Sequence, residues 1–118
     1  MLLLWYPKCT TCQKAKKYLD GAGIAYRERN IKEENPTYDE LCEWVGKSGL
    51  PTKKFFNTSG LLYRSMGLSE RLPAMSDEER LRLLATDGML VKRPLLISGD
   101  KVLVGFREKE WESFGERS

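Results

Sequence analysis

Histidine is absent from this 118-residue sequence. Its absence excludes Ser–His–Asp triads, Cys–His pairs and histidine metal sites, so an activated nucleophile must depend on backbone amides and on Lys or Arg. Long hydrophobic runs are also absent, since no apolar segment approaches the about 20 residues that a membrane-spanning helix needs. The N-terminus lacks a basic segment followed by a long apolar region, so we expect neither a secretory signal nor membrane association.

The sequence also has few cysteines and a small net charge. The three cysteines, an odd number with one close pair, are typical of a protein in the reducing cytoplasm rather than of a disulfide-stapled secreted fold. The 20 basic and 17 acidic residues are interspersed and give a net charge of +3, so charge predicts no direct binding of nucleic acid. The length fits a single domain over residues 1–118.

The most informative segment is Cys9-Thr10-Thr11-Cys12. An apolar stretch over residues 1–6 precedes it and predicts a buried strand. Thr10 and Gln13 fit a capping box that opens a helix, so Cys9 is expected at a helix N-terminus. Unpaired amides and the helix dipole favour an anion there, and they can lower a thiol pKa from ~8.5 to roughly 3.5–7.5. The pattern therefore predicts thiolate or redox chemistry.

Two other interpretations of the cysteines are a structural zinc half-site and inert core packing. Zinc needs about four ligands, and Cys42 is the only other thiol in the sequence. No metal site is therefore expected. Cys42 lies beside the apolar face of a predicted helix, and because free cysteine behaves as a small hydrophobe, we expect it in the core.

The predicted elements follow in an order typical of one fold. Around the first helix lie strands over 1–6 and 24–31, which gives a βαβ unit with parallel strands. Capping boxes at Thr37/Glu40 and Ser76/Glu79 open two helices, with short helical pieces over 50–56 and 61–66 between them. Strands over 94–98 and 101–105, joined by a turn at Gly99-Asp100, precede a helix over 107–114 with Trp111 and Phe114 facing inward. The order β-α-β, helices, β-β-α predicts an α/β, thioredoxin-like fold with an inserted helical segment over about 37–87.

Arg93-Pro94 is the second feature typical of a functional site. In a thioredoxin-like fold, the proline that opens the C-terminal hairpin is cis and faces the reactive cysteine. The residue before it then projects toward the sulfur. Arg93 in that place indicates a bound anion, because its guanidinium is a fixed, charged hydrogen-bond donor. The alternative is a solvated surface arginine.

Together with these motifs, Asp87-Gly88-Met89-Leu90-Val91-Lys92-Arg93-Pro94-Leu95 and Val104-Gly105-Phe106 give the chain a resemblance to a known family. From Tyr6 to Trp111 it resembles the arsenate reductase/Spx family. The resemblance implies a thioredoxin-like domain with a helical insertion. It also implies one of two activities: reduction of arsenate, or redox-switched regulation through the C-terminal domain of the RNA polymerase α-subunit.

The resemblance also implies roles for single residues. Cys9 matches the nucleophile of the reductases, and Arg93 matches the arginine before the cis-proline, here Pro94. Lys53 falls where the reductases have a second arginine, whereas Gly105-Phe106 occupies the region of the third. Lysine keeps the charge but not the planar fork of arginine, so oxyanion binding should be weaker than in the reductases.

Three hypotheses follow. In the first, Cys9 attacks an oxyanion or mixed disulfide held by Lys53, Arg93 and the amides around Thr10 and Thr11, and Cys12 resolves the adduct. Glutathione with glutaredoxin, or thioredoxin, then returns the electrons, with no bound cofactor. In the second, oxidation of Cys9 and Cys12 switches binding to RNA polymerase. In the third, the protein is a glutaredoxin-like oxidoreductase without an oxyanion substrate.

Overall fold

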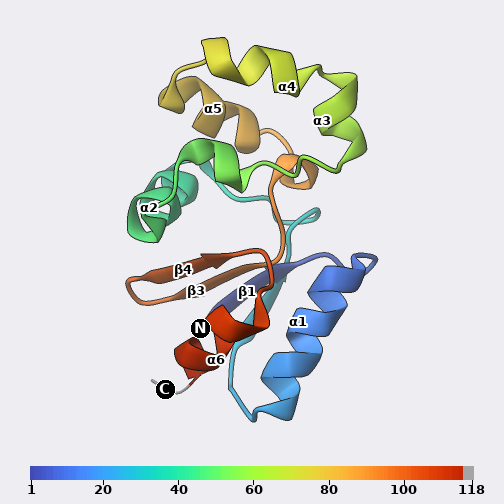
Figure 1. Ribbon diagram of the computed structural model, residues 1–118, viewed down its shortest axis with the longest axis vertical. Coiled ribbons are helices and arrows are strands. Elements are labelled where there is room, and N and C mark those ends of the chain that lie inside the picture. Colours follow the sequence, from blue (N-terminus) through green and yellow to red (C-terminus); the bar gives the residue numbers. More distant parts are fainter. Residues whose placement is uncertain (116–118) are drawn as a thin grey trace.

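A four-stranded mixed sheet forms the centre of the protein. The computed structural model describes residues 1–115 (Figure 1). The strand order is β2-β1-β3-β4, in which β1 is parallel to β2 and antiparallel to β3, and β3 is antiparallel to β4. The strands are β1 (Leu2–Trp5), β2 (Arg27–Asn30), β3 (Leu95–Ser98) and β4 (Lys101–Val104). This topology confirms the predicted thioredoxin-like fold.

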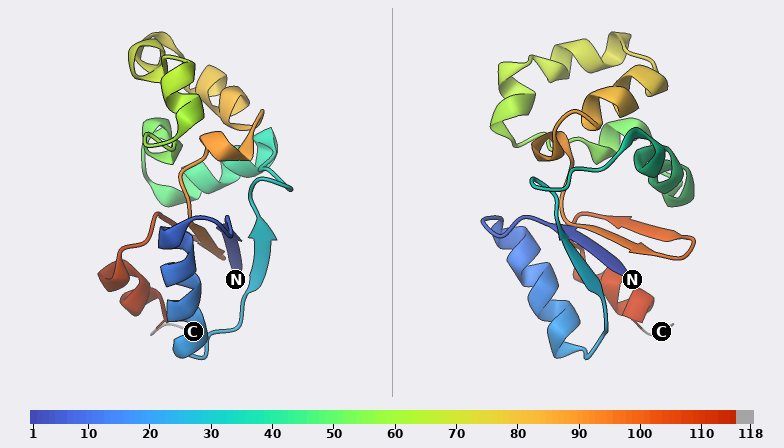
Figure 2. Two further views of the ribbon diagram at one scale, coloured as in Figure 1. Left: turned by 90° about the vertical axis from the view of Figure 1, so that its right-hand side faces the viewer. Right: turned by 180° about the vertical axis from the view of Figure 1, so that it is seen from behind.

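Alternation along the strands gives the sheet two apolar faces. Leu3 and Leu4 are neighbours on β1, both fully buried, but they belong to different core clusters. Since successive strand residues point to opposite faces, the sheet must be covered on both sides. Helices α1 (Thr10–Gly21) and α6 (Glu108–Gly115) cover the face of Leu3, where Leu19 and Trp111 pack (Figure 2).

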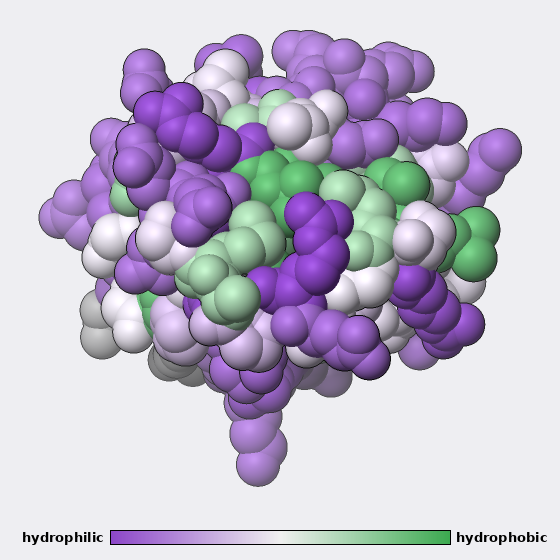
Figure 3. All heavy atoms as spheres, turned by 90° about the horizontal axis from the view of Figure 1, so that it is seen from above, coloured by the Kyte–Doolittle hydropathy of each residue, from purple (hydrophilic) through white to green (hydrophobic). Residues whose placement is uncertain are grey.

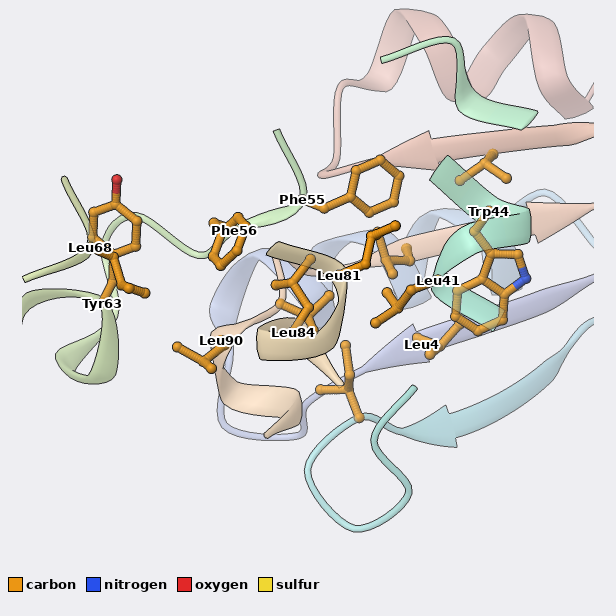
Figure 4. Packing of buried hydrophobic residues seen from close by; sticks show 14 of the residues in the cluster. Leu4, Leu41, Trp44, Phe55, Phe56, Tyr63, Leu68, Leu81, Leu84 and Leu90 are labelled. Atoms are coloured by element: carbon orange, nitrogen blue, oxygen red, sulfur yellow. The ribbon is translucent and has the colours of Figure 1, made fainter. Parts of the chain in front are cut away.

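The other face carries the inserted helical segment, which contains the larger core (Figure 4). Leu41 and Trp44, on the first inserted helix, belong to the same buried cluster as Leu4 of β1. Phe55 and Phe56 belong to this cluster too and link the sheet to the outer helices. The elements are α2 (Tyr38–Ser48), η1 (Thr52–Phe55), α3 (Leu61–Ser65), α4 (Leu68–Arg71), η2 (Leu72–Ala74), α5 (Asp77–Leu84) and η3 (Gly88–Leu90).

The ends of the helices test the predicted capping boxes. The boxes at Thr37/Glu40 and Ser76/Glu79 are both present, with reciprocal side-chain and backbone hydrogen bonds. The prediction of a capping box at Thr10 is wrong, because α1 begins one residue away from the expected N-cap. Cys9 is the N-cap of α1 and makes no side-chain cap, while the Gln13 amide donates to the Pro7 carbonyl at 2.7 Å instead.

Three further predictions differ from the structure. Cys42 is exposed rather than buried, because it follows buried Leu41 and falls on the outer side of α2. The second strand is shorter than the predicted 24–31, and the segment over 50–56 contains only the 3₁₀ turn η1. Trp111 is buried as predicted, whereas the predicted orientation of Phe114 concerns a side chain outside the described residues.

The surface is mostly hydrophilic. Viewed from the end that α3, α4 and α5 form, hydrophilic side chains surround a smaller group of apolar ones (Figure 3). Among the described residues, no helix combines the length and apolarity that crossing a membrane requires.

Candidate active site

Cys9 lies where the chain leaves the sheet and enters α1. Its N–H donates to the Tyr6 carbonyl at 2.9 Å, and its own carbonyl accepts from the Gln13 N–H at 3.0 Å. These bonds fix the backbone of Cys9 at the first turn of α1. Cys9 is half-buried, whereas Cys12, one turn later, is completely buried. The predicted position of Cys9 at the helix N-terminus is confirmed.

The two thiols have opposite pKa shifts. Burial raises the pKa of Cys9, but hydrogen bonds from the Cys12 amide and thiol, together with the charge and hydrogen bonding of Arg93, lower it below its usual value. Burial raises the pKa of Cys12 to about 12, and the neighbouring Cys9 sulfur adds to the increase. Cys9 is therefore the thiolate of the pair and Cys12 the protonated thiol.

This difference should appear in alkylation. Iodoacetamide reacts with thiolates, so Cys9 should be modified at a lower pH than a free model thiol such as N-acetylcysteine, while Cys12 stays unmodified in the native protein. The rate at each cysteine can be followed by peptide mass spectrometry after quenching. Equal rates at Cys9 and Cys12 across about pH 5 to 9 would show that the helix terminus does not activate Cys9.

Arg93 faces this thiolate from the other side of the site. The Arg93–Pro94 peptide bond is cis, as predicted, and Pro94 is buried. The Arg93 guanidinium carbon lies 5.3 Å from the centre of the Tyr6 ring. Its Nε and Nη1 atoms are buried, and the part of the chain that the structure describes offers them no hydrogen-bond partner. Unpaired buried donors cost about 1–3 kcal/mol each, so these atoms indicate a place for an anionic ligand.

A cleft of about 820 Å³ opens beside Cys9 and Arg93. Its first wall is the segment between Asn57 and Leu62, together with Met89. Two backbone bonds hold this wall beside Arg93: the Asn57 N–H donates to the Leu90 carbonyl at 2.8 Å, and the Lys92 N–H donates to the Phe55 carbonyl at 2.7 Å. The opposite wall comprises Val104, Gly105, Phe106 and Arg107.

The structure brings together only part of the predicted substrate-binding set. Thr11 lines the cleft with Cys9 and Arg93, whereas Thr10 is exposed and outside it. Lys53 is exposed on η1 and does not line the cleft, so its role toward a substrate stays a prediction.

The sequence interpretation missed the wall over 57–62 and also Lys92. The only signal for the latter was its place next to Arg93 in the motif. The described residues contain no group of three or more Cys, Asp or Glu side chains that could hold a metal ion.

The sequence also matches the model of a known protein family. The model describes the ArsC family and matches residues 4–114. The chain belongs to the ArsC family. Within it, the chain is 55% identical over 108 residues to the uncharacterized protein YusI of Bacillus subtilis, covering 92% of each chain. It is 28% identical to the global transcriptional regulator Spx of Staphylococcus saprophyticus, covering 92% of this chain and 81% of Spx.

Solved structures of ArsC proteins share the whole fold. An ArsC family related protein from Bacteroides fragilis superposes with a TM-score of 0.93 at 55% identity, covering 95% of this chain and 94% of that one. A possible arsenate reductase from Streptococcus mutans has a TM-score of 0.86 at 42% identity, covering 94% and 96%. These relatives thus include a possible arsenate reductase and a transcriptional regulator, Spx.

Proposed function

We propose that this protein is a thiol-dependent reductase of a small oxyanion, similar to the arsenate reductases. The observation that carries the proposal is the pairing of an activated Cys9 thiolate with the two unpartnered, buried N–H groups of Arg93. A guanidinium with free N–H groups can donate charge-assisted hydrogen bonds to an oxyanion while a neighbouring sulfur attacks the central atom. Charge-assisted bonds of this kind contribute about 1.5–3 kcal/mol each.

The reaction proceeds in two steps at the cysteines. The Cys9 thiolate attacks the arsenic of arsenate and forms an S–As bond as one oxygen leaves as water. The Cys12 sulfur then attacks the Cys9 sulfur, and its proton passes to an oxygen of the arsenic group. The S–As bond breaks, its electron pair stays on arsenic, and arsenite leaves. Arsenic gains two electrons, and the two thiols lose them in forming a Cys9–Cys12 disulfide.

Returning the protein to its reduced state needs an external thiol. Cys9 is the accessible sulfur of the pair, because Cys12 is completely buried, so the reductant attacks Cys9 and Cys12 leaves. Glutathione with glutaredoxin, or thioredoxin, supplies the electrons in this proposal, and no bound cofactor takes part. A reducing compartment such as the cytoplasm keeps both thiols ready.

The test couples arsenate reduction to NADPH consumption. Two parallel assays contain the protein with either glutathione, glutaredoxin and glutathione reductase, or thioredoxin and thioredoxin reductase. We expect arsenate-dependent turnover in one system, which then identifies the donor. No arsenate-dependent turnover in either would contradict the proposal, and reduction of a glutathione mixed disulfide in the same cuvette would favour a glutaredoxin-like activity instead.

One observation favours a second candidate, a redox-switched regulator that binds RNA polymerase. Gly49 ends α2 in the left-handed conformation with open space around it, and Leu50 beside it is 40% exposed. A single exposed leucine is common on protein surfaces, so the main support for this candidate is the 28% identity to the regulator Spx over 92% of this chain. A pull-down with the purified C-terminal domain of the α-subunit tests this candidate. Capture that depends on the Cys9–Cys12 redox state would support it, and no capture in either state would exclude it.

A further inference from the structure

The position of the Arg93 side chain decides how well the site works. Its charge and its hydrogen bond both favour the Cys9 anion. Arginine is a long side chain with much rotamer freedom, so it stays beside a thiolate only where other contacts hold it there. The contacts of the Arg93 guanidinium therefore show which other residues the site depends on.

Hydrogen bonds hold little of this guanidinium. Nε and Nη1 are buried, and no acceptor among residues 1–115 pairs with them. The polar contact that Arg93 does make is with Cys9, the reacting group itself. Backbone bonds on either side, from the Lys92 N–H to the Phe55 carbonyl and from the Gly105 N–H to the Pro94 carbonyl, fix the main chain. They leave the Arg93 side chain free to rotate.

The Tyr6 ring supplies the missing contact. The Arg93 guanidinium carbon lies 5.3 Å from the ring centre, within the about 6 Å at which a ring face attracts a cation. This attraction is stronger for a cation removed from water, and two of the Arg93 nitrogens are buried. Arg93 lines the cleft, whereas Tyr6 is not among the described residues that line it. The ring therefore holds the guanidinium without occupying the space that a ligand needs.

The backbone of Tyr6 contacts both cysteines. Its carbonyl accepts from the Cys9 N–H at 2.9 Å. Burial raises the pKa of Cys12 to about 12, and a hydrogen bond from the Tyr6 main chain opposes this increase. Tyr6 follows β1 directly and packs against the larger core cluster, so the sheet fixes its position. A side-chain substitution at Tyr6 keeps these backbone bonds and changes only the contact with Arg93.

We propose that Tyr6 is a positioning residue, whose ring holds the Arg93 guanidinium beside the Cys9 sulfur and at the oxyanion position. The inference rests on the proposed function only in that Arg93 binds the oxyanion there, since its effect on Cys9 needs no turnover. Without the ring, the guanidinium loses the contact that orders it and spends less time beside the thiolate. The Cys9 anion is then less favoured, and an oxyanion binds more weakly.

The test measures the pH dependence of Cys9 alkylation in the purified, reduced protein. Iodoacetamide is uncharged and reacts with the thiolate, so the midpoint of the rate against pH reports the ionisation of Cys9. Peptide mass spectrometry gives the rate at this cysteine alone. Arg93 and Cys12 are the groups that act on Cys9. Arginine stays charged throughout, and the pKa of Cys12 is about 12, so a midpoint between about pH 5 and 9 belongs to Cys9.

Two substitutions separate the ring from the rest of the Tyr6 side chain. Tyr6→Leu removes the ring and should raise the midpoint by roughly half a pH unit, which gives a roughly threefold lower rate below the midpoint. Within the described residues the Tyr6 hydroxyl makes no hydrogen bond, so Tyr6→Phe keeps the ring contact and should restore the wild-type midpoint. In the arsenate assay, Tyr6→Leu should raise KM roughly threefold and Tyr6→Phe should restore it.

Two further comparisons test whether Tyr6 acts through Arg93. In an Arg93→Met background, Tyr6→Leu should shift the midpoint no further, because no guanidinium remains to be held. Trp5→Leu is the matched control. The Trp5 ring also lies near a cation, with 5.4 Å from its centre to Lys16 Nζ, but it packs against the other core cluster, so its loss should leave the midpoint unchanged.

Urea unfolding followed by circular dichroism shows that each variant is folded, and Tyr6→Met replaces Tyr6→Leu if the latter is not. A wild-type midpoint in the folded variant without the ring would overturn the inference. An equal shift in Tyr6→Phe or Trp5→Leu, or an undiminished shift in the Arg93→Met background, would also overturn it. The proposed function is judged separately by arsenate-dependent turnover of the wild type, and its failure would leave the effect of Tyr6 on Cys9 standing.

Discussion

Replacing Cys9 with serine should lower arsenate turnover by at least about a thousandfold. A serine hydroxyl keeps the shape of the site, but it does not ionise near neutral pH, so it cannot use the hydrogen bonds and the Arg93 charge that favour the Cys9 thiolate. The same coupled NADPH assay measures the effect. Binding of the oxyanion should persist, because Arg93 and the helix amides remain.

Two matched cysteine variants separate the nucleophile from the other thiols. Cys12→Ser should perform the first attack but stop before the internal disulfide, so any turnover would depend on an added monothiol. Cys42→Ser, on the exposed surface of α2, should behave as wild type. Full activity of Cys9→Ser, or loss of activity in Cys42→Ser, would contradict the assignment of Cys9.

Replacing Gly88 with alanine should destabilise the fold by about 3 kcal/mol or more. A Cβ at this position would lie 1.8 Å from the Ile31 carbonyl oxygen and 2.7 Å from its carbon. Both are backbone atoms, and Ile31 is tied to the sheet by its N–H bond to the Trp5 carbonyl at 2.9 Å. Neither side can move without disrupting β1, β2 or the segment that leads to Arg93. Urea unfolding followed by circular dichroism measures the loss.

Gly46→Ala is the matched control for this experiment. Gly46 lies inside α2 with open space around it, and alanine in a helix interior is more favourable than glycine by roughly 0.5–1 kcal/mol. The two Gly→Ala changes should therefore have opposite signs. An unfolding midpoint for Gly88→Ala at or above the wild-type value would show that the close approach to Ile31 is not tight.

The fold and the position of the nucleophile are readable from the sequence because both depend on local patterns. Short apolar stretches place the strands, and Thr37 and Ser76 mark helix starts through capping boxes that the structure confirms. The strand-to-helix junction places Cys9, and the two apolar runs around Gly99-Asp100 place the hairpin that Pro94 opens. Each of these signals lies within a few residues of the feature that it predicts.

The errors come from contacts that local patterns do not contain. Thr10 matches a capping box, yet Gln13 finds the Pro7 carbonyl in the preceding turn and the box does not form. Cys42 is one position away from the buried side of its helix, and that shift of about 100° exposes it. The cleft wall over 57–62 depends on pairing with residues 90–92, more than thirty positions away, so no local signal predicts it.

The most direct measurement of the central claim is a single turnover without any reductant. Fully reduced protein is mixed with excess arsenate, released arsenite is quantified, and the disulfides are mapped by peptide mass spectrometry. The mechanism predicts about one arsenite per chain, a Cys9–Cys12 disulfide and a free Cys42. No arsenite, or arsenite accompanied by a disulfide to Cys42, would contradict the assignment of Cys9 as nucleophile and Cys12 as resolving thiol.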